Sequence, residues 1–233
     1  MRYLLDIARG TADGPRFRQS FVFETDDAEA TVATALTELG RREDLTDAQG
    51  NPAEAVRWEC SCLQRRCGAC AMLIDGRPAL ACDTKLADCA SATVRLDPLA
   101  KFPLVEDLMV DRSAIFEGLE RMGAWLEGEA GLPERRAAVA QEASRCMQCG
   151  CCLEVCPSFT LEGPFRGASS MMSMTRLIAE ADPSERKRLA KSYRASFYGG
   201  CAKSLACKDI CPAGLDLEAL SSRSNAAAVW GRY

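Results

Sequence analysis

Short apolar runs of strand length dominate the first hundred residues. Residues 2–8 and 18–24 alternate or run apolar, with a Gly-Pro turn between them. Asp75-Gly76 joins two further short apolar runs, a pair of residues that strongly favours a β-hairpin. Residues 92–99 then have the composition of a closing strand. The first part of the chain is therefore predicted to be rich in β-structure.

One helix is predicted among these strands, over residues 25–40. Thr25 is its expected N-cap, acidic residues fill its first turn, and Gly40 ends it. Two strands, a helix and then further strands around a loop are typical of a β-grasp domain like that of plant-type ferredoxins.

After about residue 105 the apolar residues recur at spacings of three and four. Helical spacing extends over residues 112–128, 133–146, 168–181 and 183–196, and glycines and prolines punctuate the gaps. The change of pattern predicts an α+β protein with a β-grasp domain over residues 1–104. An all-helical, ferredoxin-like domain is predicted over residues 105–233.

Composition narrows the chemistry that this chain can perform. Its 233 residues include 14 cysteines and no histidine, and the formal net charge is −4. The charge gives no reason to expect nucleic acid as a partner. The absence of histidine excludes Rieske centres, His-containing zinc sites, haem ligated by histidine and imidazole acid–base catalysis within this chain. Cysteine-ligated iron–sulfur clusters are favoured, with cysteine-only zinc as the alternative.

The apolar runs are shorter than the roughly 20 residues needed to cross a bilayer. Charged residues interrupt the N-terminal stretch MRYLLDIARG, so no signal peptide is expected. Any membrane association is therefore expected to depend on partner subunits.

The first cysteine group has the x4, x2 spacing of a plant-type [2Fe–2S] site. Gly68 within it permits close approach of the backbone to a cluster. A fourth cysteine follows the predicted hairpin, so the expected ligands are Cys62, Cys67, Cys70 and Cys82. Cys60 and Cys89 are interpreted as small buried residues outside the ligand set.

The second group, CMQCGCCLEVCP, is a bacterial ferredoxin string over residues 146–157. In such strings three cysteines hold one cubane and the fourth ligates the other cluster. A second string, CAKSLACKDICP, supplies the reciprocal cysteine from residues 201–212. The predicted ligands of a [4Fe–4S] cluster are therefore Cys146, Cys149, Cys152 and Cys211. Cys151 fits no ligand position.

The second string has Ser204 where its second cysteine would stand. Three thiolates hold three irons of a cubane and leave the fourth iron easily lost. The gap predicts a [3Fe–4S] cluster held by Cys156, Cys201 and Cys207, with serine ligation as an alkoxide as the alternative. Three clusters in one chain would form a path for single electrons.

These motifs resemble the iron–sulfur subunits of succinate dehydrogenases and fumarate reductases. The similarity rests on SCLQRRCGACAMLIDGRPALAC, CMQCGCCLEVCPSF, the cysteine spacing over residues 201–212 and PLAKFPLVEDLMVD. It implies a flavoprotein partner with FAD, and a membrane-anchor subunit of the cytochrome b type that binds quinone. The resemblance places the chain at the cytoplasmic face of the cell membrane, with an exported, periplasmic position as the alternative.

Some positions depart from the family pattern. Thr160 and Leu161 stand where succinate dehydrogenases typically have tryptophans, and Ala202 stands where they have histidine. These differences favour a fumarate-reductase-like enzyme that uses a low-potential quinol. Pro157, Ser158 and Phe159 are the candidates to line a quinone pocket.

The resulting hypothesis is an electron-transfer subunit of a succinate:quinone or quinol:fumarate oxidoreductase, with substrate chemistry on the flavin subunit. One alternative is the same electron path serving a flavoprotein reductase for another unsaturated acid, or a soluble thiol donor. The other is a cysteine–zinc interaction module.

Overall fold

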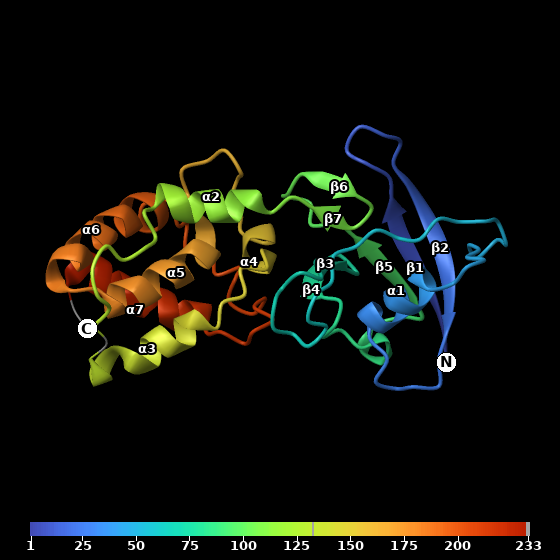
Figure 1. Ribbon diagram of the computed structural model, residues 1–233, viewed down its shortest axis with the longest axis horizontal. Helices are drawn as coiled ribbons and strands as arrows, with labels where there is room; N and C mark the ends of the chain where they lie inside the picture. Colours follow the sequence, from blue (N-terminus) through green and yellow to red (C-terminus); the bar gives the residue numbers. More distant parts are fainter. Residues whose placement is uncertain (132, 232–233) are drawn as a thin grey trace. The chain divides into compact units, whose positions relative to one another are not determined.

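A five-stranded sheet organises the first part of the chain in the computed structural model, which describes residues 1–131 and 133–231 (Figure 1). Its strands are β1 (Arg2–Arg9), β2 (Phe17–Glu24), β3 (Ala71–Ile74), β4 (Arg77–Leu80) and β5 (Thr93–Asp97). The strand order is β2-β1-β5-β3-β4, with β1 and β5 parallel and the other pairs antiparallel. This mixed sheet with one helix confirms the predicted β-grasp domain.

Alternation along β1 and β2 explains which face of the sheet is buried. Leu5 and Ile7 on β1 and Phe21 and Phe23 on β2 are completely buried, while the residues between them are less so. Successive side chains of a strand point to opposite faces, so these four fall on one face.

Helix α1 (Val32–Gly40) begins later than the sequence pattern predicted. Its N-cap is Thr31, whose hydroxyl accepts from the Thr34 N–H while the Thr34 hydroxyl accepts from the Thr31 N–H. The proposed cap, Thr25, instead accepts from the Asp27 N–H within a turn. The prediction of Thr25 was wrong because short polar side chains stabilise turns as readily as helix starts.

The predicted hairpin is confirmed between β3 and β4. Ile74 pairs with Arg77, so the turn contains only Asp75 and Gly76. Their φ angles are +50° and +76°, the left-handed values that a two-residue type I′ turn requires at both positions. The turn returns the chain along β4 and brings Cys82 towards the loop that carries the other cysteines of this domain.

A short hairpin of β6 (Leu104–Glu106) and β7 (Met109–Val110) ends the first of the two units into which the chain divides, Met1–Asp111 and Arg112–Tyr233. Asp107 in its turn is buried and accepts backbone hydrogen bonds from Gly10 and Arg57, both at 2.9 Å. The buried Arg9 guanidinium lies 3.0 Å from the same carboxylate. This ion pair fixes the hairpin to β1.

The second unit is helical, as predicted, and α5 (Gly167–Glu180) packs against the most neighbours. The others are α2 (Ser113–Arg121), α3 (Glu134–Ser144), α4 (Cys151–Glu154), α6 (Pro183–Tyr193), a π-helical turn (Arg194–Tyr198) and α7 (Leu217–Trp230). Met171, Met172 and Met174 fill the core around α5, as expected for flexible apolar side chains. The sequence pattern did not predict α7. Its many alanines and serines produce no clear apolar face at helical spacing.

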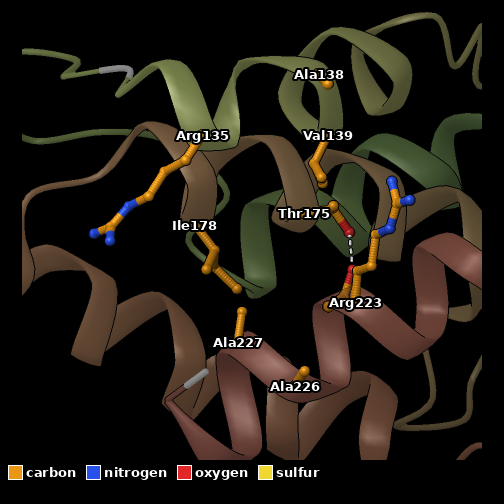
Figure 2. A pocket seen from close by; sticks show the side chains of 9 residues that line it. Arg135, Ala138, Val139, Thr175, Ile178, Arg223, Ala226 and Ala227 are labelled. Atoms are coloured by element: carbon orange, nitrogen blue, oxygen red, sulfur yellow. Dashed lines mark hydrogen bonds between the residues drawn. The ribbon is translucent and has the colours of Figure 1, made fainter. Parts of the chain in front are cut away.

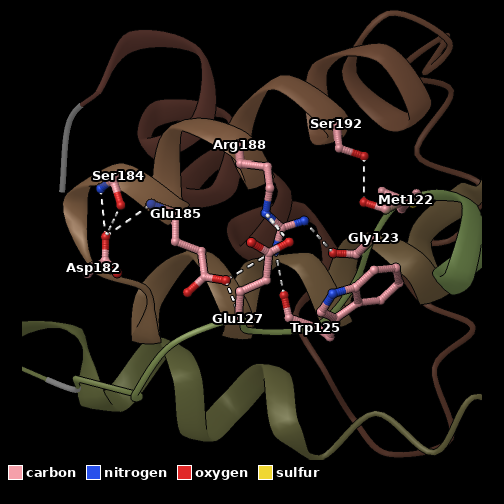
Figure 3. A network of polar contacts seen from close by, with 9 residues as sticks. All are labelled: Met122, Gly123, Trp125, Glu127, Asp182, Ser184, Glu185, Arg188 and Ser192. Carbon is pink, nitrogen blue, oxygen red and sulfur yellow. Dashed lines mark hydrogen bonds and ion pairs between the residues drawn. The ribbon is translucent and has the colours of Figure 1, made fainter.

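An arginine of α6 fixes the connection between α2 and α3 (Figure 3). Arg188 donates to the carbonyls of Gly123 and Trp125, at 3.0 and 2.7 Å. It also forms ion pairs with Glu127 and with the buried Glu185. Ser192, one turn further along, donates to the Met122 carbonyl at 2.7 Å.

Among the helices of the described residues, none is both long and apolar enough to span a bilayer.

Candidate iron–sulfur centres

The loop after Cys60 directs backbone N–H groups at two of the predicted ligands. Cys62 Sγ accepts from the N–H groups of Gln64 and Arg66, and Cys82 Sγ accepts from the N–H of Arg65, all at 3.3 Å. Such donors offset the negative charge that a thiolate-bound cluster carries. The same short loop thus serves cysteines that are 20 residues apart in the sequence.

Left-handed residues produce this arrangement. Leu63 and Arg65 have φ angles of +51° and +56°, and Gly68 has +73°. A residue with a side chain costs about 1–2 kcal/mol in the left-handed conformation. The backbone at Leu63 and Arg65 is therefore strained, as is common in functional loops. The loop curls and turns successive N–H groups towards the sulfurs.

The thiols of the predicted ligands affect one another's pKa. Backbone hydrogen bonds from Gln64 and Arg66, with a further one involving Cys67, lower the pKa of Cys62 to about 7. Burial raises the pKa of Cys70 to about 12, and its neighbours Cys82 and Cys67 add to that effect. This set of sulfur donors, with N–H groups aimed at it, fits the [2Fe–2S] group that the spacing predicted.

In the helical unit, four of the predicted ligand cysteines line one small cavity. They are contributed by the loop before α4, by α4 itself and by the loop before α7: Cys146, Cys149, Cys152 and Cys211. Apolar side chains, including Met172, Leu215 and Leu217, close the rest of the cavity. A cavity lined by soft sulfur donors and apolar side chains fits an iron–sulfur cubane.

Burial affects these thiols strongly. It raises the pKa of Cys146 to about 11 and also raises the pKa of Cys152, which interacts with Cys149, Cys146, Cys207 and Cys211. Removing such groups from water disfavours the thiolate, and binding to iron would compensate for that cost.

Cys151 lies beside the ligand string in a different role. It is completely buried, and its thiol donates to Cys149, which lowers the pKa of Cys149 to about 7 and raises that of Cys151. A cysteine that donates to a neighbouring sulfur fits the prediction that it stands outside the ligand set.

Cys156, Cys201 and Cys207 are the predicted ligands of the third centre. Burial raises the pKa of Cys207, and the thiols of Cys156, Cys201 and Cys211 add to that effect. Cys211 of the second string lines the cavity together with Cys146, Cys149 and Cys152 of the first, as the predicted crossover requires.

Ser204 has the same backbone setting as Cys149. Gln148 and Gly150 flank Cys149 with φ angles of +54° and +90°, and Lys203 and Leu205 flank Ser204 with +55° and +56°. The two strings therefore fold in one register, with serine at the place of the second cysteine. Ser204 is exposed, and its hydroxyl accepts weakly from the Ala206 N–H at 3.5 Å.

Over the described residues, no group of three or more Cys, His, Asp or Glu lies close enough to hold a single metal ion. A cluster distributes its thiolates over several irons.

The remaining cysteines are placed differently from each other. Cys60 is exposed, so its interpretation as a buried residue was wrong: it precedes the cluster loop in an extended segment without strand partners. Cys89 is half-buried, and its thiol donates to the Lys85 carbonyl at 3.6 Å.

The quinone-pocket candidates lie just after Cys156. Phe159 is buried beside Gly167, whose added Cβ would stand 3.6 Å from its ring. Pro157 is exposed and Ser158 half-buried.

A separate cavity of about 370 Å³ lies between α3, α5 and α7 and contains none of these residues (Figure 2). Its polar pair, Thr175 and Ser224, is hydrogen-bonded together and to the carbonyls of Met171 and Leu220. Arg135 and Arg223 lie at opposite sides of it.

Comparison with known proteins identifies both units. Residues 5–117 match the family model of a 2Fe-2S iron-sulfur cluster binding domain, and residues 142–215 match that of a 4Fe-4S dicluster domain. The chain is 36% identical over 198 residues to the succinate dehydrogenase iron-sulfur subunit of Bacillus subtilis, covering 80% of this chain and 76% of that protein. It belongs to the iron–sulfur subunits of the succinate dehydrogenase and fumarate reductase family.

Other members agree with this assignment. The fumarate reductase iron-sulfur subunit of Wolinella succinogenes is 34% identical over 177 residues, covering 70% of this chain and 73% of that protein. A chain of the Mycobacterium smegmatis Sdh1 complex in the apo form has the same fold, with a TM-score of 0.75 at 22% identity. That match covers 96% of this chain and 95% of the other. As an iron–sulfur subunit of this family, the protein is an electron-transfer component of an oxidoreductase and binds [2Fe–2S] and [4Fe–4S] clusters.

Proposed function

We propose that this subunit carries electrons between a flavin on a partner subunit and a quinone. The observation that supports this most is the match to a 2Fe-2S domain and a 4Fe-4S dicluster domain, which together contain all eleven predicted ligand cysteines. When bound, the clusters supply one-electron carriers, while the two-electron chemistry of the substrate belongs to the flavin.

The proposed ligand assignment follows the three sets. A [2Fe–2S] cluster takes the four cysteines of the β-grasp domain: Cys62, Cys67, Cys70 and Cys82. A [4Fe–4S] cluster takes those that line the cavity in the helical unit: Cys146, Cys149, Cys152 and Cys211. A [3Fe–4S] cluster takes the remaining three: Cys156, Cys201 and Cys207. The matching φ angles around Cys149 and Ser204 support the missing ligand of the last centre.

The partners in this proposal are an FAD-containing flavoprotein and a membrane-anchor subunit of the cytochrome b type. The subunit is peripheral, at the cytoplasmic face of the cell membrane, because its membrane contact depends on the anchor. Pro157 and Ser158 are accessible to a quinone beside the three-iron centre, and Phe159 supports them from the interior.

We propose fumarate reduction with a low-potential quinol as the favoured direction. Thr160, Leu161 and Ala202 replace the aromatic and imidazole groups that a ubiquinone pocket would use.

The test is to purify the complex and assay succinate oxidation and fumarate reduction with a low-potential quinone couple and with a ubiquinone analogue. We expect fumarate reduction by the low-potential quinol to be faster than succinate oxidation by the ubiquinone analogue. Faster succinate oxidation would reverse the proposed direction. Activity on neither substrate would favour another unsaturated acid as the substrate of the flavin subunit.

A further inference from the structure

Ser169 is a buried hydroxyl beside the cavity of the proposed four-iron cluster. It lies in the first turn of α5, its side chain is 1% exposed, and it lines the same cavity as Cys146, Cys149, Cys152 and Cys211. Within the described part of the chain, its Oγ has no hydrogen-bond partner. A buried hydroxyl without a hydrogen-bond partner is destabilising, so its presence requires an explanation.

The backbone around Ser169 is held in place by the ligand string. Gln148 lies between Cys146 and Cys149, and its Nε2 donates to the Ser169 carbonyl at 3.2 Å and to Ser173 Oγ at 3.0 Å. These two acceptors are one helical turn apart on α5, so the string and the helix are fixed to each other. Ser169 is therefore kept at the wall of the cavity.

Neighbouring serines of α5 do not share this situation. Ser170 is equally buried, at 1%, but it is not among the residues that line the cavity. Ser173 already accepts a hydrogen bond from Gln148. The other side chain of α5 that lines the cavity is Met172, which has no hydrogen to donate.

We propose that the Ser169 hydroxyl donates a hydrogen bond to a sulfur of the [4Fe–4S] cluster and raises its reduction potential. This inference rests on the proposed ligand assignment of that cluster. The sulfur is a bridging sulfide or a ligand thiolate, either of which carries negative charge and accepts hydrogen bonds. Ser169 is thus a positioning and tuning residue, since it leaves all four irons to their cysteines.

The direction of the effect follows from charge. Reduction adds one electron to the cluster, so a donor aimed at its sulfurs stabilises the reduced form more than the oxidised form. Hydrogen bonds to sulfur are among the factors that set cluster potentials. Apolar side chains such as Met172 and Leu217 line the cavity, so the field of the hydroxyl is weakly screened there.

The test is the Ser169→Ala variant of the assembled complex, measured by redox titration with EPR detection of the reduced four-iron cluster. Removing the donor should shift the one-electron reduction equilibrium about tenfold towards the oxidised form, a fall of about 59 mV in midpoint potential. The [2Fe–2S] and [3Fe–4S] midpoints should stay at their wild-type values. Ser170→Ala is the matched control and should shift no midpoint.

A second readout separates hydrogen bonding from a packing effect. Electron–nuclear double resonance of the reduced cluster in H₂O and D₂O should show an exchangeable proton that Ser169→Ala loses and Ser170→Ala keeps. If Ser169→Ala does not assemble, Ser169→Cys retains the volume with a weaker donor and should lower the same midpoint by less.

Two failures can be told apart. A four-iron signal with an unchanged midpoint and an unchanged exchangeable proton in the Ser169 variants would overturn the role of this hydroxyl alone. No four-iron signal in the wild-type complex would overturn the ligand assignment on which the inference rests.

Discussion

Single positions determine how many irons each proposed centre holds. Ser204 stands at the place of a cysteine because the residues on both sides of it, like those around Cys149, adopt left-handed conformations. A serine hydroxyl has a much higher pKa than a thiol and is a poor ligand for iron at neutral pH. The backbone therefore presents a complete ligand loop, and the side chain alone leaves it one donor short.

The Ser204→Cys substitution should restore that donor. We expect the three-iron centre to convert towards a [4Fe–4S] cluster with a lower midpoint potential, because the loop already has the required backbone conformation. EPR of the oxidised protein would show loss of the three-iron signal. Ser91→Cys, another exposed serine replaced outside the strings, should leave that signal at full intensity. A retained three-iron signal in Ser204→Cys would contradict the assigned register.

The Cys151→Ala substitution tests whether a cysteine outside the proposed ligand set is dispensable for the clusters. Cys151 donates to Cys149 and is predicted to bind no iron, so the iron content and all three cluster signals should be retained. The lost buried sulfur should lower stability by about 1 kcal/mol. Cys149→Ala is the contrasting variant and should lose the four-iron signal. Loss of that cluster in Cys151→Ala would show that the ligands are wrongly assigned.

At the scale of elements, loops position the sulfurs and helices support the loops. Arg188 of α6 fixes the segment from α2 to α3 through the carbonyls of Gly123 and Trp125 and the carboxylate of Glu127, and it also pairs with Glu185 on its own helix. Glu185 is buried, so it depends on Arg188 for compensation of its charge. Arg188 therefore makes several of the contacts that order this connection, alongside Ser192, which donates to the Met122 carbonyl.

Arg188→Ala should therefore increase local opening of residues 122–128. We expect their amide hydrogens to exchange roughly 30-fold faster, the equivalent of about 2 kcal/mol for the lost hydrogen bonds. Arg176→Ala removes an exposed ion pair with Glu180 on α5 and should change exchange by about twofold or less. Equal exchange in Arg188→Ala and the wild-type protein would show that the connection is held by other contacts.

The elements also show what the sequence could and could not predict. Alternation identified β1 and β2, and Asp75-Gly76 identified the hairpin, because both signals are local. The start of α1 was misplaced, since Thr25 and Thr31 are equally good caps in isolation and only the packing of Val32 and Leu36 selects Thr31. Helix α7 was missed because its alanines and serines do not form a recognisable apolar face in the sequence, although Leu217 and Leu220 are buried.

For the molecule as a whole, cysteine spacing carried the most information. It predicted three groups across two domains, and the comparisons confirm the family and the [2Fe–2S] and [4Fe–4S] cofactors. The hydroxyl of Ser169 gave no signal in the sequence, because its importance depends on burial beside cysteines that lie as far along the chain as Cys211. Spacing thus indicates the ligands, whereas the surroundings that tune them require the fold.

The most direct test of the whole account is Mössbauer spectroscopy of the ⁵⁷Fe-labelled complex prepared without oxygen. The account predicts about nine irons in this subunit, divided among two-, four- and three-iron centres with distinct spectra. Iron confined to two-iron and four-iron centres, with no three-iron component, would contradict the proposal that Ser204 leaves the third centre with three ligands and three irons. Zinc in place of iron would contradict the proposed electron path altogether.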